Sequence, residues 1–265
     1  MSNVNKRDKI VVFDLDETLG NFAELGIFWD SLQHYYGKKL PDSDFFELID
    51  MFPDFLRPNI INILRYLINK RDKNKCSSLM IYTNNQGPKQ WVQLISGYFD
   101  SKLESKTFDR IIKAFKVRGK IVELSRTSHN KSVDDLIKCT KIDSSTEICF
   151  LDDQYHPLMK HDNVYYINVT PYNFGLPYDK MAKTYFDNKL LKEDQDTFVN
   201  KIVMNMNKYN YKISEKNQLE KNVDLIIGKK ILLHLEDFFN KDKYHNKTLR
   251  SRKQNRKTRK QHMQN

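Results

Sequence analysis

The stretch KIVVFDLDETLG, residues 9–20, decides the fold of this chain. Its apolar beginning is typical of a buried strand, and it leads directly into two carboxylates, Asp14 and Asp16, followed by Thr18. Because a strand turns successive side chains to opposite faces, we expect both carboxylates to leave the strand on the same side. Burying two like charges together is costly unless a cation or a shared proton compensates them. The pattern therefore predicts such a compensating group beside the pair.

Size and composition are those of a globular protein. The 265 residues include 39% hydrophobic ones, which suffices for a real core. No apolar run approaches the ~20 residues that span a bilayer, and the first residues lack the apolar region of a signal peptide. We therefore expect an intracellular protein, cytoplasmic or nuclear, that is not secreted and has no membrane partner. Cys76, Cys139 and Cys149 lack metal-binding spacing, so we expect free thiols, with Cys149 in a core strand.

The positive charge of the chain is concentrated in one segment. The net charge is +11, and residues 241–265 hold ten Lys or Arg and one acid, so this segment carries +9 and the remaining chain only +2. The segment has no apolar periodicity, which predicts a basic tail that is disordered when unbound. A nuclear address or nonspecific contact with the backbone of a nucleic acid is the function that such a tail favours.

Strand-like and helical patterns alternate along the chain. Apolar runs predict strands over residues 10–15, 78–83, 147–151 and 164–169, and helical patterns occupy residues 59–70, 88–99 and 132–139. Pro58 and Pro88 stand where a first helical residue is expected, and Ser132 is a candidate cap for the third helix. Alternation of this kind predicts an α/β fold with a doubly wound, Rossmann-like parallel sheet, whose ligands bind beyond the carboxyl ends of the strands.

Polar residues follow three of the predicted strands. They are Asp14 and Asp16, then Thr83, Asn84 and Asn85, and finally Asp152 and Asp153. The three strand ends can converge in this topology, which would bring four carboxylates and a hydroxyl together in one crevice. An oxygen-rich cluster without cysteine suits a hard cation such as Mg²⁺. We therefore expect Mg²⁺ to be held by Asp14, Asp16, Asp152 and Asp153.

These residues resemble the haloacid dehalogenase (HAD) superfamily of phosphotransferases. The pattern DxDxT stands at residues 14–18, the strand-terminal threonine is Thr83, the helix-opening lysine is Lys131, and the acidic pair is LDD at residues 151–153. The spelling DLDETL, the pair Arg57-Pro58 and the LDD motif resemble more narrowly the FCP/SCP-type phosphatases, the NLI-interacting-factor-like group that acts on the C-terminal domain of RNA polymerase II. The resemblance covers roughly residues 9–180.

The resemblance implies a role for each catalytic residue. Asp14 attacks phosphorus and forms an aspartyl-phosphate, and Asp16 protonates the leaving oxygen, deprotonates the attacking water and ligates the metal through its backbone carbonyl. Thr83 and Lys131 bind the phosphoryl group, with Asn84 as a further candidate substrate contact. Of the acidic pair, the resemblance makes Asp153 the direct metal ligand. Asn85 and Gln86 are interpreted as turn residues, and His156 and His161 as incidental to the metal site.

The residues leave the substrate class open. The leading hypothesis is a Mg²⁺-dependent phosphatase acting on phosphoserine or phosphothreonine of protein. The stretch YTNNQG, residues 82–87, looks more like HAD enzymes that act on small metabolites or on 3′-phosphates of nucleic acids, so a phosphatase of that kind is the alternative. A second alternative is a catalytically inactive HAD scaffold that serves as a binding protein.

The domain organisation follows from the same patterns. We expect a HAD-like phosphatase domain over residues 1–187, a helical extension over 188–240 and the basic tail over 241–265. An insertion over residues 21–56 is rich in aromatic residues, which form either a lid over the site or, more commonly, part of the core. Packing onto the core is the default expectation for the helical extension, and a partner-docking surface is the alternative.

Overall fold

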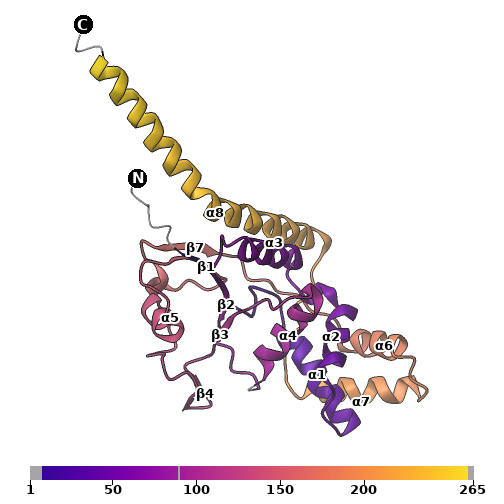
Figure 1. Cartoon of the computed structure of the whole chain (residues 1–265). Coiled ribbons are helices and arrows are strands. Elements are labelled where there is room, and N and C mark those ends of the chain that lie inside the picture. Colours follow the sequence, from indigo (N-terminus) through magenta and orange to yellow (C-terminus); the bar gives the residue numbers. More distant parts are fainter. Residues whose placement is uncertain (1–7, 89, 262–265) are drawn as a thin grey trace.

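A five-stranded parallel sheet lies at the centre of the protein. A computed structural model describes the backbone of residues 8–88 and 90–261, and the side chains of those up to residue 240. The strand order is β3-β2-β1-β6-β7, and each neighbouring pair is parallel. The strands are β1 (Lys9–Phe13), β2 (Ser78–Tyr82), β3 (Arg110–Ile112), β6 (Glu147–Asp152) and β7 (Val164–Asn168). β1 is therefore the central strand, and Phe13 lies opposite Ile81 and Leu151 (Figure 1).

The four predicted strands and the α/β class are confirmed, with two differences. The short edge strand β3 has only three residues, too few for an apolar pattern to stand out in the sequence. β1 ends at Phe13, two residues earlier than expected, because residues 14–20 form a turn in which Glu17 has a positive φ of 57°. The strand alternation therefore does not extend to Asp16.

Helices cover both faces of the sheet. They are α1 (Ala23–Tyr36), α2 (Asp42–Met51), α3 (Ile60–Asp72), α4 (Trp91–Leu103), α5 (Val133–Thr140), α6 (Tyr178–Asn188), α7 (Gln195–Asn207) and α8 (Gln218–Gln261), with short 3-10 turns η1 (Pro53–Phe55) and η2 (Pro157–Met159). Ile10 and Val12 of β1 share the smaller core with α5. Val11 and Phe13 point into the larger core, to which the other α-helices contribute. The alternation predicted for a strand buried on both faces is thus observed.

The first residues of three helices differ in part from the predicted ones. Ser132 caps α5 as expected, since its Oγ accepts a hydrogen bond of 3.1 Å from the backbone N–H of Asp135. Pro58 and Pro88 are not first helical residues, so those two predictions are wrong. Pro58 precedes Asn59, whose left-handed φ of 70° separates the proline from α3. Pro88 lies in a turn, and its carbonyl accepts a hydrogen bond from Trp91 before α4 begins.

The aromatic insertion forms part of the core. It folds into α1, α2 and η1, and its rings contact one another edge to face. Five of the predicted aromatic residues are buried, namely Phe22, Phe28, Trp29, Phe45 and Phe52, while Tyr35, Tyr36 and Phe46 pack half-buried against them. The expectation that these residues are core is confirmed. Cys76, Cys139 and Cys149 are free thiols, also as predicted, and Cys149 lies in β6.

The segment after residue 188 packs on the same core as the sheet. α7 contacts α1 and α6, and α8 contacts α3 and β7. Ile231, Leu235 and Phe238 of α8 belong to the larger core, and the carbonyl of Phe238 accepts a hydrogen bond of 2.9 Å from Nζ of Lys9 at the start of β1. α8 is therefore part of the folded body where it crosses α3, as Figure 1 shows.

The basic segment continues the last helix, and its disorder when unbound stays a prediction. α8 continues as helix through it to Gln261, and residues 262–265 lie outside the described part. Residues 241–261 contain neither Pro nor Gly and are rich in Lys, Arg and Gln, which favour helix. A docked helix already supplies the nucleus, so extension costs little. Within the described residues, no helix is both long and apolar enough to cross a membrane.

Close backbone approach at Gly228 fixes α8 against α3. A Cβ at this position would lie 2.3 Å from the carbonyl oxygen of Pro58. We expect Gly228→Ala to lower the free energy of unfolding by about 1–3 kcal/mol, because backbone atoms must move to admit the methyl group. Urea denaturation measures this change. Lys229→Ala, at an exposed position of the same helix, is the control, and equal stability of the two variants would contradict the expectation.

A buried carboxyl in α1 predicts pH-dependent stability. Glu24 is fully buried, its Oε1 accepts a hydrogen bond of 3.0 Å from Leu176 N, and its Oε2 has no partner among the described residues. Burial raises the pKa of Glu24 to about 7, against the opposing effect of the Leu176 N–H. Because this folded-state pKa lies above the ordinary value, the stability from Glu24 is full at low pH and is lost as pH rises through about 7.

Glu24→Gln removes this proton linkage. Between pH 5 and pH 8 we expect the free energy of unfolding to fall by about 2 kcal/mol less in Glu24→Gln than in the wild type. Urea titrations at the two pH values give the difference, and the exposed Glu104→Gln serves as control. Parallel pH dependence of the wild type and Glu24→Gln would show that Glu24 is ionised in the folded state.

Candidate active site

The candidate site lies beyond the carboxyl ends of the three central strands. Asp14 follows β1, Thr83 follows β2, and Asp152 ends β6, with Asp153 next to it. The chain proceeds from β1 outward to β3 on one side and returns to β6 and β7 on the other. This reversal of strand order at β1 is the place where open parallel sheets bind ligands.

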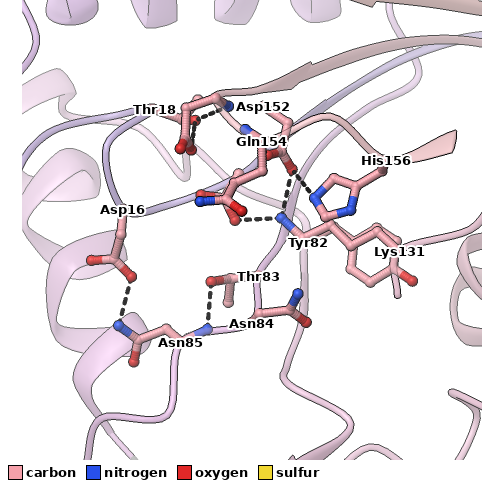
Figure 2. A network of polar contacts seen from close by, with 12 residues as sticks. Asp16, Thr18, Tyr82, Thr83, Asn84, Asn85, Lys131, Asp152, Gln154 and His156 are labelled. Carbon is pink, nitrogen blue, oxygen red and sulfur yellow. Dashed lines mark hydrogen bonds and ion pairs between the residues drawn. The ribbon is translucent and has the colours of Figure 1, made fainter. Parts of the chain in front are cut away.

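Lys131 joins the two sides of the site. Its Nζ donates hydrogen bonds to Oδ1 of Asp14 and, at 2.6 Å, to Oδ2 of Asp152. Only 2% of the Lys131 side chain is exposed, and the rings of Tyr82 and Phe150 lie 5.8 and 5.9 Å from Nζ. Lys131 directly precedes the capping Ser132 of α5, so the rigid start of a helix positions this cation between the strand ends (Figure 2).

The two carboxyl groups bound by Lys131 are in different electrostatic states. Burial raises the pKa of Asp14 to about 7; Lys131 opposes this shift and Asp152 adds to it. Burial also acts to raise the pKa of Asp152, but His156 and Lys131 outweigh it and the net pKa is below the ordinary value. Nε2 of His156 lies 3.2 Å from Oδ2 of Asp152, an ion-pair distance without hydrogen-bond geometry. Asp152 is therefore the ionised partner of Lys131.

Three carboxylates form a candidate cation site. One oxygen from each of Asp14, Asp152 and Asp153 lies within 4.8 Å of the others. Thr18 Oγ1 donates a hydrogen bond of 3.2 Å to Asp153, and burial, followed by the repulsion of Asp152, raises the pKa of Asp153. One ammonium faces three carboxyl groups here, so the group carries excess negative charge when ionised. Oxygen donors with this excess charge fit a hard divalent cation.

Asp16 lies beside this cluster, where Asn85 holds its carboxyl group. Its Oδ2 accepts a hydrogen bond of 2.7 Å from Nδ2 of Asn85. β1 ends at Phe13, so Asp14 and Asp16 both stand in the turn that follows the strand, and the charge of Asp16 still acts on Asp14. That the two carboxylates share one side stays a prediction. Burial raises the pKa of Asp16, and the Asn85 hydrogen bond opposes the shift. Figure 2 shows Asp16 directed at Asn85 and apart from Lys131.

The segment after β2 approaches the acids from the other side. Thr83 is buried, and its Oγ1 accepts a hydrogen bond of 2.9 Å from the backbone N–H of Asn85. Oδ1 of Asn84 accepts a hydrogen bond of 2.8 Å from Arg126. Thr83 is thus placed at the strand end as predicted, while Asn84 is held by a neighbouring arginine. The roles of both in substrate binding stay predictions.

Two buried arginines hold the loops of the site, and the sequence motifs indicate no catalytic role for either. Arg57 is 1% exposed and donates to the carbonyls of Glu17, Thr18 and Thr170. Arg126 is 3% exposed and donates to the carbonyls of Thr83, Lys113 and His129. Each arginine therefore ties together segments that are distant in sequence. Arg57 stands in the Arg57-Pro58 pair noted in the sequence, whereas no pattern distinguishes Arg126 from a surface arginine.

Asn85 and His156 also contact residues of the site, although the sequence indicated a turn residue for Asn85 and no metal role for His156. Asn85 contacts Asp16, and Oδ1 of Asn85 accepts a hydrogen bond of 2.8 Å from Gly87 N, so its side chain is fixed from two sides. His156 lies beside Asp152 at the i,i+4 spacing. His161 contacts Asn163 instead, away from the acids. The spacing of His156 from the LDD motif is the signal that could have identified it.

Comparisons of the chain with protein-family models, with curated proteins and with solved structures found no match.

The acidic cluster predicts stabilisation by divalent cations. A cation that binds only the folded state at 100 times its Kd adds about 2.7 kcal/mol to the free energy of unfolding. We expect Mg²⁺ or Mn²⁺ to raise the Tm of the wild type in thermal denaturation, and Asp153→Asn to reduce this rise. Asp162→Asn, at an exposed position outside the cluster, is the matched control. An equal rise of Tm in all three proteins would place cation binding elsewhere.

Proposed function

We propose that this protein is a Mg²⁺-dependent phosphomonoester hydrolase in which Asp14 forms an aspartyl-phosphate intermediate. The observation that carries the proposal is the contact of Lys131 with both Asp14 and Asp152 at the ends of adjacent parallel strands, beside Asp153. Phosphoryl transfer needs a nucleophile, positive charge at the phosphoryl oxygens and a proton for the leaving group. The resemblance to HAD phosphatases assigns these same residues to those tasks.

Asp14 must be ionised to attack phosphorus. Burial raises its pKa to about 7, and the shared Lys131 opposes this shift. Mg²⁺ held by Asp14, Asp152 and Asp153 would supply further positive charge for Asp14 and for the phosphoryl oxygens. Lys131 binds the same oxygens as a compact point charge, and Thr83 at the neighbouring strand end donates its hydroxyl.

Asp16 carries the proton in both half-reactions. In the first, an oxygen of Asp14 bonds to phosphorus, the ester P–O bond breaks, and Asp16 gives its proton to the leaving oxygen. In the second, a water oxygen attacks phosphorus, Asp16 takes back a proton, and the bond from phosphorus to Asp14 breaks to release inorganic phosphate. Asp16 must start protonated, and burial favours this by raising its pKa. The hydrogen bond from Asn85 sets the orientation of the carboxyl group.

The substrate and partners stay at the level of proposals. A phosphorylated protein was the leading expectation, and a small phosphomonoester or a nucleic-acid 3′-phosphate was the alternative. A cavity lined by Asn85, the partner of Asp16, supports the small-molecule alternative. Contact of residues 241–265 with nucleic acid stays a prediction from their charge.

Removal of the nucleophile tests the proposal. We expect the wild type to hydrolyse p-nitrophenyl phosphate with Mg²⁺ and to lose this activity in EDTA. Asp14→Asn should lower kcat at least about 10³-fold, because the amide cannot form the acyl phosphate. Asp179→Asn, exposed on α6, is the control and should retain activity. Turnover that persists in Asp14→Asn and in EDTA would contradict the mechanism.

A further inference from the structure

A cavity of about 830 Å³ opens next to the candidate site. Asn85, which holds Asp16, is one of its lining residues. The cavity lies between α1, the segment from Asn85 into α4, and the turn of the hairpin formed by β4 (Lys116–Val117) and β5 (Lys120–Ile121). In Figure 1, β4 and α1 lie on either side of α4. Asn85 therefore connects the cavity with Asp16, the proposed proton donor to the leaving group.

We propose that the cavity binds the leaving group of the substrate and that this group is a nucleoside or a similar planar, hydrogen-bonding ring system. The inference rests on the proposed hydrolase function, which places the scissile phosphoryl group at Asp14 and Asp16. The volume falls within the about 300–1,000 Å³ that is usual for small-molecule sites. Residues from α1, from the start of α2, from α4 and from the β4–β5 turn surround it, which suits a compact ligand better than an extended peptide.

The ring-binding wall is built around Trp91. This indole packs edge to face on Phe45 with ring centroids 5.1 Å apart. Two glycines make room for it, since a Cβ at Gly26 or at Gly87 would lie 3.0 or 3.2 Å from atoms of the indole. Trp91 is buried, with 8% of its surface exposed, so it lines the cavity in a fixed position. A preordered aromatic ring favours a planar ligand because little conformational entropy is lost on binding.

The polar lining favours a ligand without additional phosphates. Gln33, Gln90 and Gln93 line the cavity with amide groups, which both donate and accept hydrogen bonds as the edge of a nucleobase does. The charged lining residues balance, with Lys39 and Arg118 against Asp30 and Asp42. Tyr209 donates a hydrogen bond to Asp30, and Lys39 donates one of 3.3 Å to Gln90. A cavity wall with equal numbers of positive and negative side chains gives no net electrostatic attraction for an oligonucleotide or a polyphosphate.

The hairpin completes the cavity with Arg118. Arg118 and Gly119 have positive φ angles of 49° and 77°, the conformation of a tight two-residue turn that matches the strand twist. This turn places Arg118 in the cavity wall opposite α1. The cation is then available to the ribose hydroxyls or the face of a bound ring.

Filling the cavity tests the assignment. Ala23 is an exposed residue at the start of α1 that lines the cavity, so the indole of Ala23→Trp occupies ligand space without disturbing the core. Hydrolysis of adenosine monophosphate, of glycerol 2-phosphate and of a phosphoserine peptide is compared in full-length wild type and variant. We expect the ratio of kcat/KM for adenosine monophosphate to that for glycerol 2-phosphate to fall at least tenfold. Leu233→Trp, exposed on α8, is the control and should leave this ratio unchanged.

Calorimetric titration with adenosine, which has no phosphate to lose, separates the two proposals. We expect adenosine to bind the wild type, Ala23→Trp to weaken binding at least tenfold, and Gln90→Leu to weaken it about threefold or more. Adenosine binding without hydrolysis of any phosphomonoester would overturn the hydrolase function and support the ligand class of the cavity. Hydrolysis without adenosine binding, preference for the phosphopeptide, or a ratio unaffected by Ala23→Trp would overturn the cavity assignment.

Discussion

One buried ammonium shared by two carboxylates is the constraint on which the candidate site depends. Lys131 reaches both Asp14 and Asp152, although these residues follow different strands and all three are buried. Deleting one partner of a buried ion pair typically costs about 3–5 kcal/mol, because the other charge is left without compensation. The start of α5 and the ends of β1 and β6 must therefore keep their relative positions. Arg126 and Arg57 maintain this arrangement by binding the backbone of the loops on either side.

The site residues at the strand ends were predictable because two independent features of the sequence, its hydrophobic pattern and its motif chemistry, indicate the same positions. Asp14, Thr83 and Asp152 follow apolar runs that must be buried, so both hydrophobic pattern and chemistry indicate their place. Lys131 was predictable only in the context of its helix, since one lysine among many carries no local signal. The parallel sheet and its order around β1 likewise follow from the alternation of strands and helices.

Other features depend on tertiary contacts that no local pattern encodes. The carboxyl group of Asp16 is held by Asn85, which looks in sequence like any turn asparagine. Arg126 resembles a surface residue until the segments that it binds are brought together. Hydrophobic periodicity also says nothing about the helical continuation of α8 through the basic segment, because the docked part of α8 nucleates it. The cavity beside α1 also could not be predicted, because the aromatic residues of the insertion over residues 21–56 indicate a core but not a cavity at its border.

The hydrogen bond from Lys9 to the carbonyl of Phe238 has a consequence for biosynthesis. These residues are 229 positions apart, so the helix that covers the start of the central strand leaves the ribosome long after the strand itself. β6, the neighbour of β1 on one side, is also synthesised more than a hundred residues later. Such non-local pairing slows folding, because distant segments must meet before their contacts form. The nascent chain must therefore keep the apolar residues of β1 unpaired on one edge through most of translation, which makes this strand a natural site for chaperone binding.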